Sequence, residues 1–322
     1  MLTPRQETPI YRVFEDLDCV SAAFTGKGTR RENYYFSFQR SRIDLAILRA
    51  NVEAYGRALD FDPSAVTWPN GRWPHSGQVI IAERQDWAPA RSAPGIVPVS
   101  RETGLPLSYD GIATASPEFV LGVQGADCPS LFLCDPGVGI IGAAHAGWKP
   151  TVRGVVPNLV AAMTSLGAAA SNMLAFLSPG VGDRYNEFAW DLSMEPHIKD
   201  VFVKAGRPEL PEDHSIRHVM SVEDRQAVCR STGRPIGSGV AFMLSALIAK
   251  DLVAAGLVPT NIDISSESTI VERYADESGT LSSDYRYHSA QRDAGRDPER
   301  PRFGSSLCVM YLRGKVITKP AD

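Results

Sequence analysis

The sequence predicts an α/β protein in which mixed β-sheets are flanked by helices. Short apolar runs that are typical of buried strands are interspersed with longer stretches whose apolar residues recur at helical spacing. Strands and helices do not alternate strictly, so a purely parallel, doubly wound sheet is not expected. A chain of 322 residues can bury a substantial core, and we expect residues 1–322 to form a single domain.

Composition argues against several classes of protein. The net charge of −4 argues against a general nucleic-acid binder, which would carry a basic bias. No run is long and apolar enough to span a bilayer, and no apolar segment follows the N-terminus as in a signal peptide. The five cysteines are odd in number and scattered, which favours a reducing compartment over a disulfide framework. We therefore expect a cytoplasmic protein that binds neither nucleic acid nor membranes.

The first third of the chain begins with a polar arm, residues 1–18, and a basic loop that contains Lys27. Apolar positions at helical spacing predict a helix over Arg42–Leu59. A segment rich in Pro, Ala, Ser and Gly, Trp87–Leu107, is predicted to be a surface insertion within the same domain. Residues compatible with β-structure predict strands in five places: Cys19–Phe24, Tyr34–Phe38, Gln78–Glu83, Asp110–Thr114 and Phe119–Val123.

The stretch Val123–Thr151 is predicted to be a buried hairpin that ends in two metal-ligating residue types. A turn at Asp135-Pro136-Gly137 separates two apolar runs, and the glycine spacing of the second run fits this hairpin better than a dinucleotide-binding loop. Cys128 and His145 stand at the ends of the two halves, beside glycine and alanine neighbours. Small neighbours leave room for a group other than protein to approach the thiol and the imidazole.

The remainder of the chain is predicted to contain further helices and strands of both kinds. The predicted helices are Thr151–Leu166, Glu195–Ala205 and Val240–Ala255. The predicted strands are Leu174–Ser178, Ile262–Ile264 and Leu307–Leu312, the last joined by a hairpin turn to Val316–Thr318. Arg207–Pro235 is too charged and too weakly periodic for a prediction.

A catalytic zinc site usually has three protein ligands and an open position, so Cys128 and His145 need a third partner. The histidine in Pro74-His75-Ser76-Gly77 stands out because it lies in a tight turn before a predicted strand. From the residues alone, an ordinary turn histidine is the favoured interpretation of His75.

Two motifs carry a resemblance to a known family. Ala126-Asp127-Cys128 together with His145-Ala146-Gly147-Trp148 resembles the signature of the laccase-domain family, whose members are named polyphenol oxidase, purine nucleoside phosphorylase or peptidoglycan editing factor. Weaker matches are spread along the chain at Pro74–Val79, Asp110–Thr114, Ser178–Gly182 and His288–Arg292. The resemblance implies a four-layer α/β/β/α fold, similar to cysteine hydrolases of the cytotoxic-necrotising-factor type. It also implies that His75, Cys128 and His145 bind zinc, with copper as the alternative metal.

The function implied by the resemblance is a zinc-dependent reaction on purine nucleosides: phosphorolysis of adenosine, inosine or guanosine, adenosine deamination, or both. The expected partners are a purine nucleoside and phosphate. Beside the three ligands, Asp127 is a candidate catalytic acid or base, although bracing the backbone is an equally good interpretation of its role. The candidates for binding substrate or phosphate are Lys149, Thr151, Arg292 and Lys27, chosen for charge and position.

Three alternatives stay open at this point. Cys128 could be the nucleophile of a Cys-His hydrolase or amidase acting on a cell-wall precursor, with His145 or His75 as its base. The chain could be a copper-dependent phenol oxidase, although one mixed Cys/His site gives no obvious place for four-electron oxygen reduction. It could also be a non-catalytic metal-binding protein.

Overall fold

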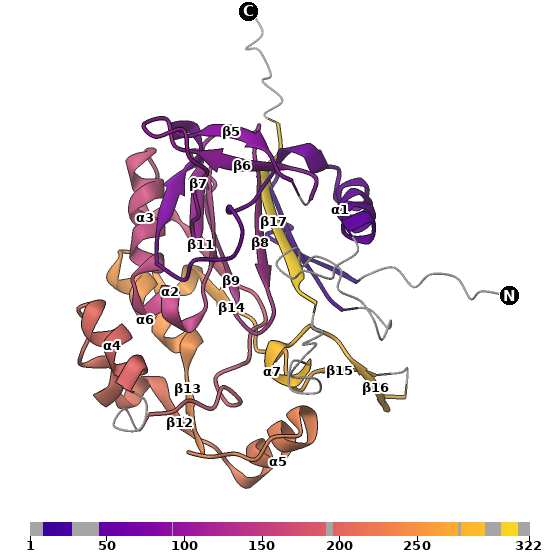
Figure 1. Cartoon of the computed structure of the whole chain (residues 1–322), viewed down its shortest axis with the longest axis vertical. Coiled ribbons are helices and arrows are strands. Elements are labelled where there is room, and N and C mark those ends of the chain that lie inside the picture. Colours follow the sequence, from indigo (N-terminus) through magenta and orange to yellow (C-terminus); the bar gives the residue numbers. More distant parts are fainter. Residues whose placement is uncertain are drawn as a thin grey trace, which may run out of the picture.

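A computed structural model describes residues 9–27, 45–91, 93–190, 196–275, 278–293 and 304–314. Two large β-sheets lie face to face at the centre of the molecule, with helices on their outer faces (Figure 1). Each sheet contains both parallel and antiparallel pairs, which confirms the predicted mixed sheets. A smaller part, below the sheets in Figure 1, holds the two-stranded sheet β12–β13 and helices α4 and α5.

The first sheet has seven strands in the order β1-β2-β17-β8-β3-β6-β5. The last strand of the chain, β17, lies between β2 and β8 and is antiparallel to both, so distant parts of the sequence close this sheet. Its strands are β1 (Ile10–Val13), β2 (Val20–Thr25), β3 (Val66–Thr67), β5 (Asp86–Pro89), β6 (Ile96–Val99), β8 (Val120–Gly125) and β17 (Ser306–Leu312).

The second sheet has six strands in the order β14-β11-β9-β10-β7-β4. Its centre is the predicted hairpin: β9 and β10 pair antiparallel, with Asp135 opposite Ile140 and Ser130 opposite His145. Its strands are β4 (Val79–Ile81), β7 (Gly111–Thr114), β9 (Ser130–Asp135), β10 (Ile140–His145), β11 (Leu174–Leu177) and β14 (Ile262–Ile264).

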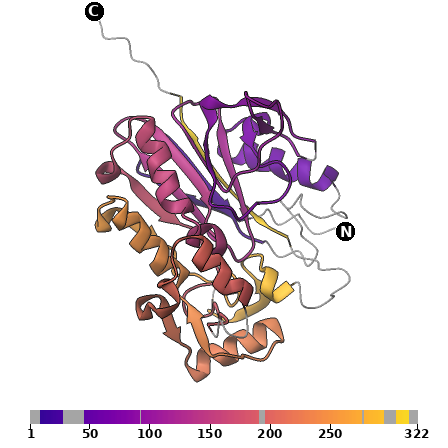
Figure 2. The ribbon, with the colours of Figure 1, turned by 60° about the vertical axis from the view of Figure 1, so that its left-hand side comes forward.

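Three apolar clusters hold the layers together. Between the sheets, Leu121 and Met310 of the first pack with Phe132 and Ile141 of the second. Outside the first sheet lies α1 (Leu45–Leu59), whose apolar face joins a second cluster. Outside the second sheet lie α3 (Val155–Ser165) and α6 (Leu244–Ala254), side by side in Figure 2. The order helix, sheet, sheet, helix confirms the four-layer fold that the family resemblance implies.

The helix predicted at Thr151–Leu166 is two helices, α2 (Trp148–Val152) and α3, separated at Gly154. Gly154 has φ 89°, a left-handed conformation that glycine adopts without steric cost. Pro157 then falls in the first turn of α3, where a missing N–H breaks no intrahelical hydrogen bond.

The helix predicted at Val240–Ala255 was wrong in its first turn. Val240–Phe242 forms β13, which pairs antiparallel with β12 (Arg217–Val219), and α6 begins only at Leu244. The segment is apolar on most sides, so it carries no clear period that would separate a strand from a helix.

Other predicted segments differ in detail. The strand predicted at Gln78–Glu83 is shorter, because a 3-10 turn over Ala82–Arg84 follows β4. The segment predicted to be a surface insertion contains β5 and β6, which pair antiparallel at the edge of the first sheet. The polar arm contains β1, which pairs with β2.

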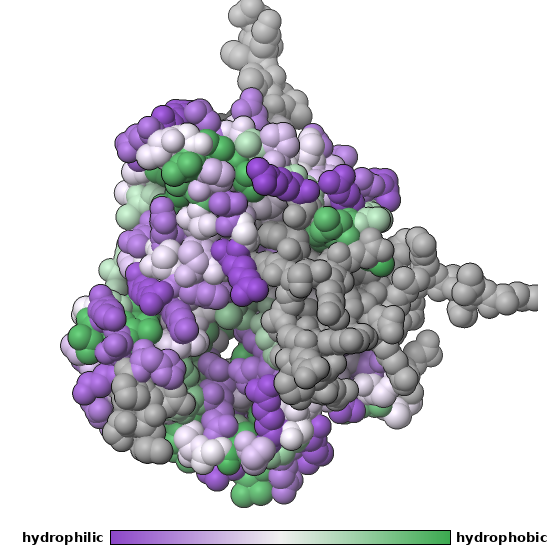
Figure 3. Space-filling view, in the orientation of Figure 1, coloured by the Kyte–Doolittle hydropathy of each residue, from purple (hydrophilic) through white to green (hydrophobic). Residues whose placement is uncertain are grey.

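The remaining elements are α4 (Pro196–Lys204), α5 (Val222–Thr232), β15 (Arg273–Ala275), β16 (Leu281–Tyr285) and α7 (Ala290–Asp293). The strand predicted at Tyr34–Phe38 and the hairpin into Val316–Thr318 lie outside the described residues. Among the described helices, none is both long and apolar enough to cross a membrane. Where Figure 3 shows described residues, hydrophilic and apolar side chains are intermixed over the surface.

Candidate metal centre

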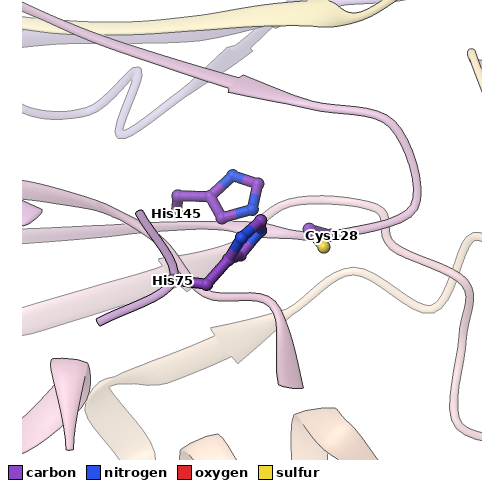
Figure 4. A group of neighbouring side chains, drawn as sticks. All are labelled: His75, Cys128 and His145. Carbon is purple, nitrogen blue, oxygen red and sulfur yellow. The ribbon is translucent and has the colours of Figure 1, made fainter. Parts of the chain in front are cut away.

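Three side chains that can ligate a metal ion meet at one end of the second sheet. One ligand atom each of His75, Cys128 and His145 lies within 4.8 Å of the others, and the two imidazoles lie beside the Cys128 sulfur (Figure 4). They come from the loop before β4, the loop between β8 and β9, and the last position of β10. The fold therefore brings together the residues that the resemblance implies as ligands.

The His145 ring is fixed so that one nitrogen faces this group. Its Nδ1 lies 2.8 Å from the carbonyl oxygen of Gln124, and because a carbonyl only accepts, Nδ1 carries the proton. Nε2 therefore has a free lone pair, and it is buried without a hydrogen-bond partner. The Trp73 indole stacks on the imidazole, with ring centroids 5.1 Å apart and planes 7° apart. A buried acceptor without a donor is costly, so a bound cation would satisfy His145 Nε2.

The His75 imidazole lies next to that of His145 (Figure 4). The centroids of the His75 and His145 rings are 5.2 Å apart, with an angle of 65° between the planes. The backbone of His75 has φ 52°, a left-handed conformation that is uncommon for a residue with a side chain. A conformation of this kind persists only where the surrounding contacts hold it.

Two glycines leave the space that Cys128 occupies. A Cβ atom on Gly125 would lie 2.3 Å from the Cys128 carbonyl oxygen. A Cβ atom on Gly147 would lie 2.6 Å from Cys128 Sγ and 3.5 Å from His145 Nε2. The small neighbours seen in the sequence are thus a steric requirement of the thiol and the imidazole.

Burial keeps all three side chains uncharged in the metal-free protein. It lowers the pKa of His145 to about 3 and lowers the pKa of His75, so both imidazoles are neutral at pH 7. Burial, with the nearby charges of Asp127 and Asp110, raises the pKa of the Cys128 thiol to about 12. Two neutral imidazoles and a sulfur that a cation would convert to thiolate form a donor set that suits zinc.

Asp127 lies beside Cys128 in sequence, but its carboxylate is used elsewhere. Thr269 Oγ1 donates to Asp127 Oδ1 at 2.7 Å, and the backbone N–H of Gln291 donates to Oδ2 at 2.6 Å. These bonds join the Cys128 loop to Thr269 and to α7.

Of the two candidate phosphate ligands on α2, Lys149 is the one that carries a charge. Its positive charge lowers the pKa of His75, and its Nζ lies 5.5 Å from the centroid of the Trp148 ring. Thr151 is fully buried, and its hydroxyl donates to the carbonyl oxygen of Ala146 at 3.2 Å. Its hydroxyl is therefore engaged with the main chain, and a role for Thr151 in binding phosphate stays a prediction.

Arg292 is fully buried and its guanidinium is committed to the protein. Its nitrogens donate to the carbonyl oxygens of Thr269, at 2.7 Å, and Tyr287, at 2.7 Å, and to both carboxylate oxygens of Asp293. These contacts engage the guanidinium within the protein, and a role for Arg292 in binding phosphate stays a prediction. Lys27 lies nearby, with Nζ 3.5 Å from Asp293 Oδ2, so its charge is also paired.

Two residues of this region were missed by the sequence analysis. Asp110 accepts hydrogen bonds from the His75 loop, and Arg153 Nη1 donates to the His75 carbonyl oxygen. Arg153 also lowers the pKa of His75 by its charge. Asp110 stands in one of the segments that resemble the family, but its contact with His75 spans 35 positions of sequence and that of Arg153 spans 78, so the sequence alone assigns neither residue a role at the centre.

Two of the curated relatives of this chain are named purine nucleoside phosphorylase. Purine nucleoside phosphorylase ORF3 of Streptomyces griseus is 34% identical over 152 residues, which are 47% of this chain and 55% of the relative. Purine nucleoside phosphorylase Rv2149c of Mycobacterium tuberculosis is 39% identical over 144 residues, 45% of this chain and 50% of the relative. The chain thus spans about half the length of these two curated relatives.

The fold is also found in a solved structure. The hypothetical protein YfiH of Bacillus licheniformis superposes with a TM-score of 0.62 at 21% identity, covering 91% of this chain and 93% of that one. The family described as multi-copper polyphenol oxidoreductase laccase matches residues 39–300. That match takes in most of the sequence, including all three residues of the candidate metal centre, and the chain therefore belongs to the multi-copper polyphenol oxidoreductase laccase family.

Proposed function

We propose that this chain is a zinc-dependent enzyme that acts on purine nucleosides, and that phosphorolysis is its reaction. The observation that carries the proposal is that His75, Cys128 and His145 each bring one ligating atom to the same place. Nε2 of His145 has no hydrogen-bond partner there. The nucleoside as substrate is supported by the names of the curated relatives, of which this chain matches about half.

His75, Cys128 and His145 would hold the metal, which when bound supplies a positive charge that polarises substrate oxygen atoms. The carbonyl of Gln124 fixes the tautomer of His145, and Gly147 keeps the space beside the sulfur open. The neutral state of both imidazoles at pH 7 means that no proton has to leave a histidine before a cation binds.

Lys149 and Arg153 would hold the phosphate. Two observations support this choice: both cations lower the pKa of His75 by their charge, and Arg153 Nη1 donates to the His75 carbonyl oxygen. Phosphorolysis replaces the bond between the purine nitrogen and the sugar carbon by a bond to a phosphate oxygen, and the purine departs with a proton. A pair of cations beside the centre would bind the phosphate anion and orient it for this attack.

The raised pKa of Cys128 favours a ligand over a free nucleophile. Cysteines that act as nucleophiles have lowered pKa values and lie among positive groups. Here burial, with the negative charges of Asp127 and Asp110, raises the pKa of the thiol to about 12. The Cys-His hydrolase is therefore the weaker alternative.

The experiment that tests this proposal separates nucleosides from free bases by chromatography, with and without phosphate. We expect free purine to appear only when phosphate is present, and Lys149→Ala to raise the phosphate KM at least tenfold. The control is Lys204→Ala, because Lys204 is exposed on α4. An unchanged phosphate KM in Lys149→Ala would remove Lys149 from the site. Conversion of adenosine to inosine without phosphate would show deamination in place of phosphorolysis.

A further inference from the structure

The carboxylate of Asp110 is completely buried at the start of β7 and faces the loop that carries His75. Its Oδ1 accepts the backbone N–H of His75 at 2.9 Å. Its Oδ2 accepts the N–H groups of Ser76, at 2.5 Å, and Gly77, at 2.8 Å, and the Ser76 hydroxyl at 3.1 Å. Three successive backbone N–H groups thus converge on one carboxylate.

This arrangement explains how the loop keeps its unusual backbone. His75 and Gly77 have φ values of 52° and 79°, and only the glycine adopts such a value without cost. On the other side of the loop, Arg153 Nη1 donates to the carbonyl oxygen of His75, and Asn158 Nδ2 donates to that of Gly77 at 2.9 Å. The loop is therefore held between the Asp110 carboxylate and two side chains, one at the end of α2 and one in α3.

The main chain of Asp110 makes a second contact with the centre. Its carbonyl oxygen accepts the backbone N–H of His145 at 2.7 Å. One residue thus hydrogen-bonds to the backbones of both histidines, through its side chain to His75 and through its carbonyl to His145. β7 pairs in parallel with β4, which follows the His75 loop, and antiparallel with β10, which ends in His145, so these contacts are built into the sheet.

We propose that Asp110 is the positioning residue of the metal centre: its buried carboxylate holds His75 in the left-handed conformation that aims the imidazole at His145 and Cys128. Asp110 touches neither metal nor substrate in this account and acts only through the His75 loop. The inference rests on the proposed function, because the group that it positions is the proposed zinc site. Outer residues that orient metal ligands typically contribute 10- to 100-fold to metal affinity.

The informative substitution is Asp110→Asn, which keeps the shape of the side chain. An amide has one acceptor oxygen and one NH₂ group, so it cannot accept from all three N–H donors. At least one donor of the loop would then face another donor in a buried place, which favours a rearranged loop. We expect affinity for Zn²⁺ to fall by roughly 10- to 100-fold.

The chain offers a matched control in Asp135. This carboxylate is also buried, and it also accepts two backbone N–H groups, of Gly137 at 3.0 Å and of Ala169 at 2.9 Å. Asp135 lies at the end of β9 opposite to the Cys128 loop. Asp135→Asn should cost stability in the same way and leave Zn²⁺ affinity within about threefold of the wild type, because no ligand depends on it.

The test measures two properties of the full chain: affinity for Zn²⁺ alone, by competition with a chromogenic chelator, and hydrogen exchange of the amides at residues 75–77. Slow exchange at these amides in wild type and Asp135→Asn, together with fast exchange and weakened Zn²⁺ binding in Asp110→Asn, supports the proposal. Equal Zn²⁺ affinities in Asp110→Asn and Asp135→Asn would overturn it.

The two measurements also separate this inference from the proposed function. If the wild type binds no Zn²⁺, the proposed zinc enzyme is ruled out, and the exchange data alone decide whether Asp110 holds the loop. Unchanged exchange at residues 75–77 in Asp110→Asn would then overturn the role of Asp110. Slow exchange in wild type that is lost only in Asp110→Asn would support that role.

Discussion

Glycine at position 147 leaves the volume in which the Cys128 sulfur lies against His145. Its backbone angles, φ −63° and ψ 169°, are ones that alanine adopts freely. The effect of a methyl group here would therefore be steric and not conformational, since the Cβ would lie 2.6 Å from Cys128 Sγ. This makes Gly147 a sensitive probe of the centre.

We predict that Gly147→Ala weakens Zn²⁺ binding on the order of 10- to 100-fold, because the sulfur must move away from His145. Zinc content after dialysis against a weak chelator measures the effect. The control is Gly237→Ala, whose Cβ would make only an ordinary 3.5 Å contact with Glu187. Retention of zinc in both variants would show that Cys128 is not a ligand.

His288 is a second buried imidazole, and neither of its ring nitrogens has a hydrogen-bond partner among the described residues. Burial and, to a smaller extent, the positive charge of Lys27 lower its pKa to about 3, while the negative charge of Asp293 opposes this shift. The unfolded chain binds the proton at about pH 6.5, so between pH 6.5 and 3 only the unfolded state is charged. The buried His288 imidazole therefore lowers the free energy of unfolding as the pH falls through that range.

We predict that His288→Phe removes this cost. The difference in unfolding free energy between His288→Phe and wild type should grow by about 2 kcal/mol from pH 7.5 to pH 5, since each pH unit below 6.5 contributes about 1.4 kcal/mol. Urea denaturation of the metal-free proteins at the two pH values measures it. His214→Gln, at an exposed position, is the control. A constant difference would mean that His288 takes up its proton in the folded protein.

Residues that belong to contiguous motifs were predictable, and their long-range partners were not. Cys128 and His145 have small neighbours in the sequence that signal the space around them, and the family resemblance added His75. The pairing of Asp110 with the His75 loop spans 35 positions, and that of Arg153 with His75 spans 78. Such partners depend on how β4, β7 and α2 pack, which no local pattern encodes.

At the scale of elements, α3 packs unusually close to β10 at Gly142. A Cβ atom there would lie 2.8 Å from Met163 Sδ and 2.9 Å from Leu159 Cδ1. Both side chains belong to the cluster between α3 and the second sheet. The glycine therefore sets the distance between the helix layer and the strand that ends in His145.

Gly142→Ala should destabilise the protein by about 1–3 kcal/mol, because the added methyl overpacks a closed interface. Chemical denaturation compares it with Gly314→Ala, where a Cβ would have no neighbour within 4 Å. Equal stability of the two variants would show that α3 can shift away from β10 at no cost.

The elements that were predicted well are those with a clear period or boundary. The β9–β10 hairpin has its turn residues between two apolar runs, and α1 has apolar positions on one face. Helix α5 was missed although Ser221 and Asp224 form a capping box, a start signal that charged residues obscured. The sequence predicts helix where β13 forms. The strand that pairs with it, β12, lies in Arg207–Pro235, for which the sequence gives no prediction.

At the scale of the whole molecule, the layers followed from the family resemblance, and the strand order did not follow from the sequence. β17 closes the first sheet between β2 and β8, a contact between the two ends of the chain. Pairing of this kind depends on long-range packing between the sheets.

The family description refers to several copper ions, whereas the described residues bring together one group of three His and Cys ligands. One mixed site of this kind suits a single zinc ion better than a copper cluster that transfers four electrons to oxygen. The fold thus presents one centre at the end of the second sheet, where Lys149 and Arg153 add positive charge.

The most direct test of this account is metal analysis of wild type and Cys128→Ala, combined with the nucleoside assay with and without phosphate. We predict near-stoichiometric zinc in wild type, loss of zinc in Cys128→Ala, and phosphate-dependent release of free purine by wild type alone. Wild-type protein without metal, whose Cys128 is alkylated rapidly, would contradict the account and favour a cysteine hydrolase.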